Sequence, residues 1–360
     1  MQRRGWVSEE EYADLVALCQ FLPGPASSQV GIGLGIRRAG PLGGLAAWLG
    51  FTLPSAVALV LFAFGVAAAG DVSDAGWLRG LKVVAVAVVA QAVWGMARGL
   101  TPDRPRITLA VAAAVLTLVW PTALGQVVTI LLGGLLGWLF AKGEATPVAE
   151  SRAFPVGRRL GVAMLVTFFV LLVALPLLRE ATGAFGIAVA DSFYRAGALV
   201  FGGGHVVLPL LQVEVVPPGW LDDQTFIAGY GAAQAVPGPL FTFAAYLGAV
   251  MLPGLAGLGT ALIALAAIFA PSFLLLMGVL PFWHQLRSMA PVQAALRGVN
   301  AAVVGILLAA LYDPVWTSAI RGGGDFALAL VSFLLLAFWR WPAWLVVIIS
   351  ALIGVVVPAS

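Results

Sequence analysis

The side chains of this chain that could bind a ligand gather around two copies of a Pro-Gly-Pro triplet. The first set is Gln20, Pro23, Gly24, Pro25, Ser27 and Ser28, and the second is Gln234, Pro237, Gly238, Pro239 and Thr242. A helix that begins after such a triplet presents unpaired N–H groups and a partial positive charge, which suit an anion. The hydroxyl and amide groups add further donors. Plain capping of the following helix is an equally good interpretation of the Ser and Thr residues.

A second group of candidates surrounds a run of three glycines: Arg195, Gly202, Gly203, Gly204 and His205. An ionisable side chain inside an apolar segment is costly, so it indicates function by default. Arg195 could neutralise part of an anion's charge, or it could pair with Asp191 one turn earlier. His205 could titrate near neutral pH and move a proton, or it could serve as a capping or packing residue.

Other chemistries find little support in the sequence. The chain has two histidines and one cysteine, Cys19, so neither a histidine-rich nor a multi-cysteine metal site is indicated. No Gly-Lys-Ser loop for nucleotide phosphates is present, and the glycine runs lack a dinucleotide-fold setting. We therefore expect no enzyme activity, no metal and no cofactor.

The elements that must position these residues are membrane-spanning helices. The chain is 61% hydrophobic and 10% charged, with a mean hydropathy of +1.03, whereas a water-soluble domain carries about 25% charged residues. The net charge is +3, and the basic residues lie in short loops, which indicates topology rather than nucleic-acid binding. Apolar runs long enough to cross a bilayer are expected near 41–70, 77–98, 106–120, 121–141, 159–178, 255–281, 290–311, 325–339 and 341–357.

The chain is a duplicated unit. Gly5-Trp6 and the first triplet recur 214 positions later as Gly219-Trp220 and the second triplet. Further on, the segment Phe51–Ser55 aligns with Ile268–Ser272, and Arg79-Gly80 aligns with Arg297-Gly298. Duplicated units with interrupted apolar segments are typical of transporters. We expect helices that break at both triplets and at the three glycines, although a surface loop between two helices is an alternative interpretation of each triplet.

Loop charges indicate that the two units are inverted. Arg3-Arg4 and Arg37-Arg38 of the first unit correspond to uncharged residues of the second, as expected if these loops face opposite sides of the membrane. We divide the chain into a first membrane repeat (1–141), a cytoplasmic linker (142–158), a connecting transmembrane helix (159–184) and a second membrane repeat (185–360). The repeat mates Arg79 and Arg297 are expected to snorkel to the interface, and tryptophans such as Trp48 to lie there.

These motifs resemble the chromate ion transporter family. The resemblance covers nearly the whole chain, through Arg3-Arg4-Gly5-Trp6, Leu22–Pro25 and Arg37–Gly40 in the first half, and through Phe201–His205, Gly219-Trp220 and Gln234–Pro239 in the second. Members open each half with a phenylalanine–glycine–glycine helix. Here the residue matching Phe201 would fall at position −13, so the opening helix expected for the first half is absent. A misplaced start, a trimmed chain or a real loss would each explain this. The family's usual proline after the glycine pair is replaced by Gly204.

The resemblance implies an all-α polytopic membrane protein of two inverted-topology repeats with broken or re-entrant helices. It implies a secondary transporter of oxyanions in the cytoplasmic membrane, exporting chromate and also handling sulfate, by alternating access. The partners implied are the oxyanion and the lipid bilayer, with no nucleic acid and with a homodimer as one option. A passive anion channel is an alternative, and a membrane-embedded enzyme acting on lipids is another.

Overall fold

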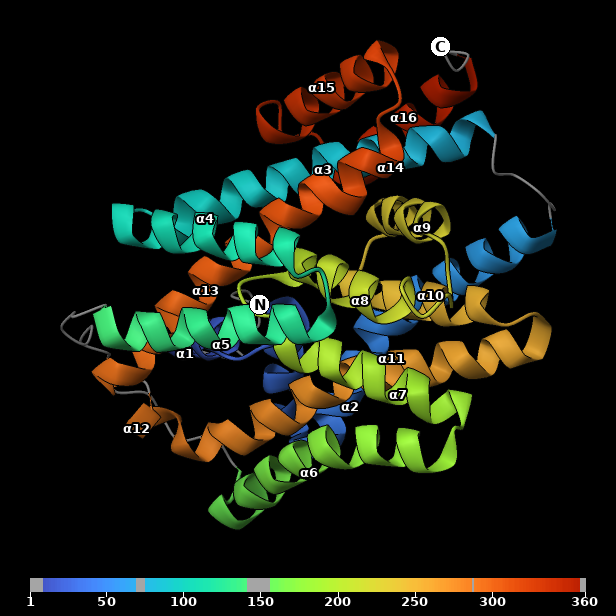
Figure 1. The fold of residues 1–360 in the computed structure, drawn as a ribbon. Coiled ribbons are helices and arrows are strands. Elements are labelled where there is room, and N and C mark those ends of the chain that lie inside the picture. Colours follow the sequence, from blue (N-terminus) through green and yellow to red (C-terminus); the bar gives the residue numbers. More distant parts are fainter. Residues whose placement is uncertain (1–8, 69–74, 141–155, 287, 357–360) are drawn as a thin grey trace.

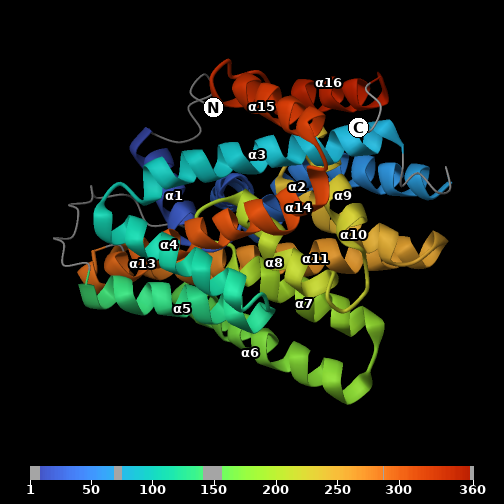
Figure 2. The same cartoon turned by 45° about the horizontal axis from the view of Figure 1, so that its top comes forward.

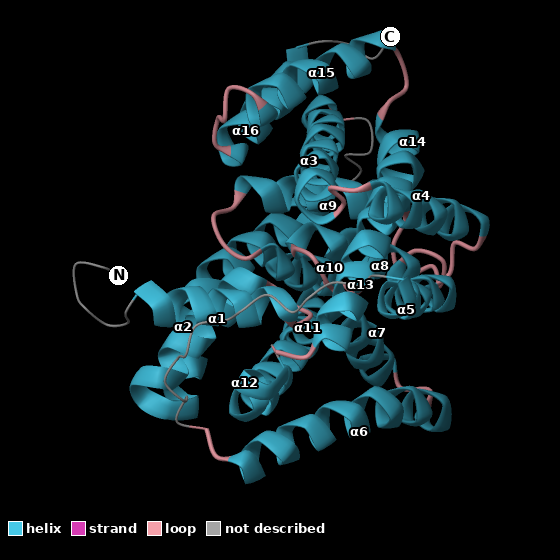
Figure 3. Cartoon of the chain, turned by 90° about the vertical axis from the view of Figure 1, so that its left-hand side faces the viewer, coloured by secondary structure: helices cyan, strands magenta, loops and turns pink. Residues whose placement is uncertain are grey.

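The fold was obtained as a computed structural model, which describes residues 9–68, 75–140, 156–286 and 288–356. Within these ranges every regular element is a helix and no strand occurs (Figure 3). Gly5-Trp6 and most of the expected linker 142–158 lie outside the described residues. The chain is thus an all-α protein, as the composition predicts.

Five segments of the described residues are long and apolar enough to cross a membrane. They are α2 (Ala26–Ala68), α3 (Gly76–Leu100), α6 (Arg158–Thr182), α11 (Gly254–Val279) with the turn that follows it, and α13 (Ala290–Ala310) with its continuation to Ala319. The other helices are α1 (Glu9–Phe21), α4 (Arg104–Val119), α5 (Ala123–Phe140), α7 (Phe185–Leu199), α8 (Val207–Val215), α9 (Asp223–Ala235), α10 (Phe243–Met251), α12 (Trp283–Leu286), α14 (Thr317–Ala319), α15 (Gly323–Ala337) and α16 (Ala343–Val356).

The short helices that adjoin the three glycines and the second triplet lie in the middle of the molecule. Figures 1 and 2 place α8, α9 and α10 between the long helices, with α6 at one edge and the α15–α16 pair at the opposite edge. The helix α2 is bent, because Ala39 and Gly40 leave helical geometry and Pro41 follows them. The span expected near 41–70 begins at this bend.

The outer surface of the molecule is apolar. Along α6, large side chains such as Phe169, Val173 and Leu177 are exposed, each by 59% or more. A monomeric protein in water does not present a continuous apolar face of this kind. The surface therefore fits a polytopic protein whose outer helices face lipid.

Glycines bring the inner helices close together. Gly298 of α13 lies against Gly133 and Gly137 of α5 so closely that a Cβ on it would approach their backbones to under 3.0 Å. Small residues at helix contacts are the usual means of close packing in membranes, where the hydrophobic effect does not drive helices together. This packing holds the α5–α13 pair beside the candidate site.

Candidate functional site

The first Pro-Gly-Pro turn is buried inside the protein. The helix α1 ends at Phe21 and α2 begins at Ala26, and Pro23, Gly24 and Pro25 between them are all buried. The prolines lack N–H groups, and Gly24 adopts a φ of +122°, which favours glycine. The predicted helix break is confirmed, and the surface-loop alternative does not hold for this turn.

The turn is enclosed by residues of the second half of the chain. The Gly24 N–H donates to the Val200 carbonyl oxygen at 2.7 Å, just after α7. From α11, Ser272 Oγ lies so close to Gly24 that a Cβ there would be under 3.0 Å from it. Within the first half, Gln29 Nε2 donates to the Pro23 carbonyl oxygen at 2.7 Å. The N-terminus of α2 is therefore held rigidly at the contact between the two halves.

Several buried polar atoms at the first turn and elsewhere in the protein have no hydrogen-bond partner among the described residues. The donors are Ser28 Oγ, Trp48 Nε1, Thr52 Oγ1, Ser272 Oγ and Gln234 Nε2, and the acceptors are Gln29 Oε1 and Gln126 Oε1. Ser28 is 2% exposed, and Ser272 is fully buried. An unpaired buried polar group costs about 1–3 kcal/mol, so such groups usually have a ligand or water as partner.

Trp48 belongs to the same region, although the sequence predicts it at the membrane interface. Its half-buried ring packs edge-on against Phe269 at 5.4 Å and Phe273 at 5.7 Å between centroids. These two rings flank Ser272 on α11. The tryptophan is thus placed between helices rather than in an outer belt.

The second Pro-Gly-Pro turn has a matching backbone but different surroundings. The helix α9 ends at Ala235, Gly238 adopts a φ of +155°, and both Pro237 and Gly238 are exposed. A Cβ on Gly238 would come under 3.0 Å from Ser55 Oγ of α2. Each triplet glycine therefore packs against the serine of a Pro-Ser pair in the opposite half.

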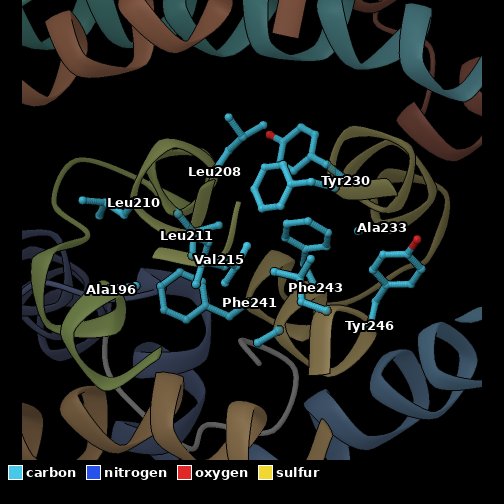
Figure 4. Close-up of a cluster of buried hydrophobic side chains, with 14 of the residues drawn as sticks. Ala196, Leu208, Leu210, Leu211, Val215, Tyr230, Ala233, Phe241, Phe243 and Tyr246 are labelled. Carbon is cyan, nitrogen blue, oxygen red and sulfur yellow. The ribbon is translucent and has the colours of Figure 1, made fainter. Parts of the chain in front are cut away.

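Two hydroxyls beside the second turn are engaged, whereas Thr52 Oγ1 and Gln234 Nε2 near it have no partner among the described residues. Thr242 Oγ1 donates to the Pro239 carbonyl oxygen at 2.8 Å, and Ser55 Oγ donates to the Thr52 carbonyl oxygen at 3.0 Å. The helix start after this turn packs in an aromatic cluster, where Figure 4 shows Phe243 beside Tyr230 and Tyr246. Thr242 precedes α10 but makes no side-chain capping bond to its N–H groups; its hydroxyl donates back to a carbonyl instead.

The segment with the three glycines lies close to both Pro-Gly-Pro turns. Gly202 and Gly203 have φ values of 76° and 149°, which let the chain turn sharply between α7 and α8. A Cβ on Gly204 would lie 3.8 Å from Leu240 Cβ, directly after the second turn. His205 Nδ1 is 2.8 Å from Tyr230 Oη, so its ring is fixed to α9.

Arg195 lies in a nearly neutral network of charges. Its Nε donates to Glu214 Oε1 at 2.8 Å and its Nη2 to Asp191 Oδ2 at 2.8 Å. Arg179 also pairs with Asp191, at 3.2 Å. The predicted pair with Asp191 is present, whereas Glu214 and Arg179 were missed because they lie on other helices. Two arginines and two carboxylates balance, which leaves little free positive charge at Arg195.

A groove of about 730 Å³ reaches both Pro23 and Arg195. Its lining is mostly apolar and comes from α5, α6, α7, α11 and α13, with Trp138 on α5, and from Phe201 after α7. A second cavity of about 500 Å³ lies beside Asp222, Thr225 and Tyr246. There, burial favours the neutral form of Asp222, but hydrogen bonds from the Thr225 backbone and side chain outweigh it and lower the pKa of the carboxyl.

Not all of the predicted residues lie at the first turn. Ser28 is buried there, while Gln20 and Ser27 are exposed. The sequence did not indicate that unpartnered buried polar groups would include Ser272, Trp48, Thr52 and Gln29. The alignment of Ser55 with Ser272 was the one signal that could have pointed to Ser272. The snorkelling predicted for Arg79 is wrong, because its Nε pairs at 2.6 Å with Asp325, which is 2% exposed.

Comparison with known proteins gives a consistent result. The family model described as "Chromate transporter" matches residues 1–138 and 187–355. A "Chromate transport protein" of Pseudomonas aeruginosa is 29% identical over 88% of this chain and 74% of its own length. A "Probable chromate transport protein" of Synechococcus elongatus is 26% identical, over 99% of this chain and 88% of its own. A "Chromate transport protein" of Cupriavidus metallidurans is 25% identical over 99% of this chain and 85% of its own length. No solved structure matches the chain.

Proposed function

The chain belongs to the chromate transporter family, and we propose that it carries chromate across the cytoplasmic membrane as a secondary transporter. The observation that supports this most directly is the buried start of α2. There a helix N-terminus, with the unpartnered hydroxyl of Ser28 in its first turn, lies inside a polytopic membrane protein. Unpaired N–H groups and hydroxyls bind an oxyanion without requiring a metal or cofactor.

Chromate and sulfate share a tetrahedral shape and a double negative charge, so we propose that sulfate competes for the same site. The groove that reaches Pro23 would give the ion a route toward the turn. In cells we expect the direction of transport to be export, which would lower the intracellular chromate concentration and confer resistance.

The mechanism that we propose is alternating access between two inverted repeats. The loop charges support the inversion, and the reciprocal contacts Gly24–Ser272 and Gly238–Ser55 support a two-fold relation between the halves. Both contacts cross from one half to the other, so a rocking motion of the halves would change both together. The driving force would be the membrane potential, a proton or a counter-anion.

Flux measurements in proteoliposomes test this proposal. We expect uptake of labelled chromate that saturates with concentration, is inhibited by sulfate and shows counterflow when unlabelled chromate is loaded inside. A passive anion channel, the alternative function, would show neither saturation at low substrate nor counterflow. Absence of any chromate flux above that of empty liposomes would contradict the proposal.

A further inference from the structure

We propose that the chain binds one oxyanion, at the first Pro-Gly-Pro turn, and that Ser272 from the opposite half is one of its ligands. This inference rests on the proposed transport of an oxyanion and adds where and how many ions bind. It differs from the sequence-based expectation, in which candidate ligands gather at both turns.

The first argument is the arrangement of unused donors. Ser28 Oγ comes from the first turn of α2, and Ser272 Oγ comes from the middle of α11; neither has a hydrogen-bond partner among the described residues. Ser272 Oγ and Gln29 Nε2 both lie within 3.0 Å of the position that a Gly24 Cβ would occupy. Because Gln29 is tied to the Pro23 carbonyl oxygen, the turn is fixed while the hydroxyls stay available.

The second argument is that the equivalent donors of the other turn are engaged. The offset that aligns the triplets pairs Ser28 with Thr242, and the offset that aligns the Pro-Ser motifs pairs Ser272 with Ser55. Thr242 donates to Pro239 and Ser55 donates to Thr52. An ion held by these two hydroxyls would have to break their bonds, whereas an ion at the first turn would satisfy the matching hydroxyls of Ser28 and Ser272, which are buried unpaired. Gln234 Nε2 and Thr52 Oγ1 are also unpartnered near the second turn, so the contrast between the turns lies in the matched hydroxyls alone.

The third argument concerns charge. Arg195 and Arg179 together are balanced by Glu214 and Asp191, so the positive potential at the first turn comes chiefly from the α2 N-terminus. Neutral hydroxyl donors on a helix terminus hold a dianion without a full counter-charge. Such a site suits transport, because an ion that is bound without an ion pair is also released readily.

The test compares Ser272→Ala with the matched control Ser55→Ala. Both variants remove the hydroxyl of a Pro-Ser pair that packs against a triplet glycine. Loss of a hydrogen bond to a charged ligand corresponds to roughly a 10- to 100-fold weaker affinity. We expect this change in the KM for chromate with Ser272→Ala and less than a twofold change with Ser55→Ala. Sulfate inhibition should weaken in parallel.

A second measurement counts the ions. Equilibrium dialysis of the detergent-solubilised chain against labelled chromate should give one ion per chain, and Ser272→Ala should weaken that binding. The inference would be overturned if the two serine variants had equal effects, or if two equivalent ions bound to each chain. The proposed function would still stand in either case, provided that the wild-type protein transports chromate. If Ser272→Ala does not fold, Ser28→Ala replaces it in the same test. We expect the same rise in the KM for chromate, and an unchanged KM would contradict the inference.

Discussion

The two Pro-Gly-Pro turns have the same sequence and related backbone geometry, yet they lie in different chemical environments. At the first turn all three residues are buried, and Ser28 and Ser272 have free hydroxyls. At the second turn Pro237 and Gly238 are exposed, and both corresponding hydroxyls bond to backbone carbonyls. The neighbouring residues differ as well, since the polar Gln29 after the first turn corresponds to the aromatic Phe243 after the second.

This comparison separates two requirements that a duplicated motif must satisfy. The glycine meets a steric requirement, because each triplet glycine faces a serine of the opposite half at a distance that allows no Cβ. The residues that follow the triplet decide whether the helix start can bind a ligand. A repeated motif therefore predicts a repeated backbone more securely than a repeated binding site.

The largest effect is expected from Gly24→Ala. The new Cβ would approach Ser272 Oγ and Gln29 Nε2 to under 3.0 Å, at a φ of +122° that L-residues rarely adopt. We expect chromate flux per folded molecule to fall at least 100-fold. Gly238→Ala is the matched control: its Cβ would also come under 3.0 Å from a serine at a positive φ, but its turn is exposed and holds no proposed ligand, so its flux should fall far less. Equal losses in the two variants would remove the functional distinction between the turns.

The next effect is expected from Arg195→Gln. The change leaves Asp191 and Glu214, which are 3% and 7% exposed, without their shared cation. Breaking a buried ion pair on one side costs about 3–5 kcal/mol, and the partial exposure of Arg195 places the loss at about 3 kcal/mol or below. We expect a lower melting temperature, measured in detergent, and flux per folded molecule within a few-fold of wild type.

Arg195→Lys provides the control for that variant. It keeps the charge but not the two-pronged geometry, so its stability should lie between wild type and Arg195→Gln. If flux is abolished while the melting temperature stays unchanged, Arg195 binds the ion directly. The first turn would then depend on a full positive charge rather than on neutral donors.

Features that depend on local sequence were predictable. The expected span 290–311 corresponds to α13 at Ala290–Ala310, and 159–178 corresponds to α6 at Arg158–Thr182. Apolar run length decides such spans, since the bilayer fixes how many residues are needed. The breaks at the triplets and at Gly202–Gly204 were predictable for a similar reason, because proline and glycine disrupt a helix wherever they occur.

Features that depend on long-range contacts were not predictable. The partner of Arg79 is Asp325, 246 residues away, and no periodicity in the sequence relates the two. Glu214 was missed as a partner of Arg195 because the turn at the glycines, not the helix spacing, brings them together. Ser272 was visible as the mate of Ser55, but only the structure distinguishes a hydroxyl that is engaged from one that is free.

A smaller effect is expected from Tyr230→Phe. This change leaves His205 Nδ1, 2.8 Å from the lost hydroxyl, without its partner. A lost hydrogen bond of this kind costs about 1–2 kcal/mol. Because the pair ties the glycine turn to α9 near the second triplet, we expect a modest fall in the melting temperature with flux nearly unchanged. A large loss of flux with unchanged stability would instead indicate that His205 takes part in transport.

The smallest effect is expected from Thr242→Val, which keeps the shape of the side chain and removes only its hydroxyl. That hydroxyl donates to the Pro239 carbonyl oxygen, so its loss should cost about 1 kcal/mol of stability. Since the hydroxyl is already engaged in the absence of substrate, the KM for chromate should change less than twofold, while Ser28→Ala at the matching position raises it roughly 10-fold. Flux measured across a chromate series for the two variants gives both values. A KM that rises equally in both would mean that the Pro239 bond breaks when the ion binds, and that the second turn is a binding site closed only in the unloaded state.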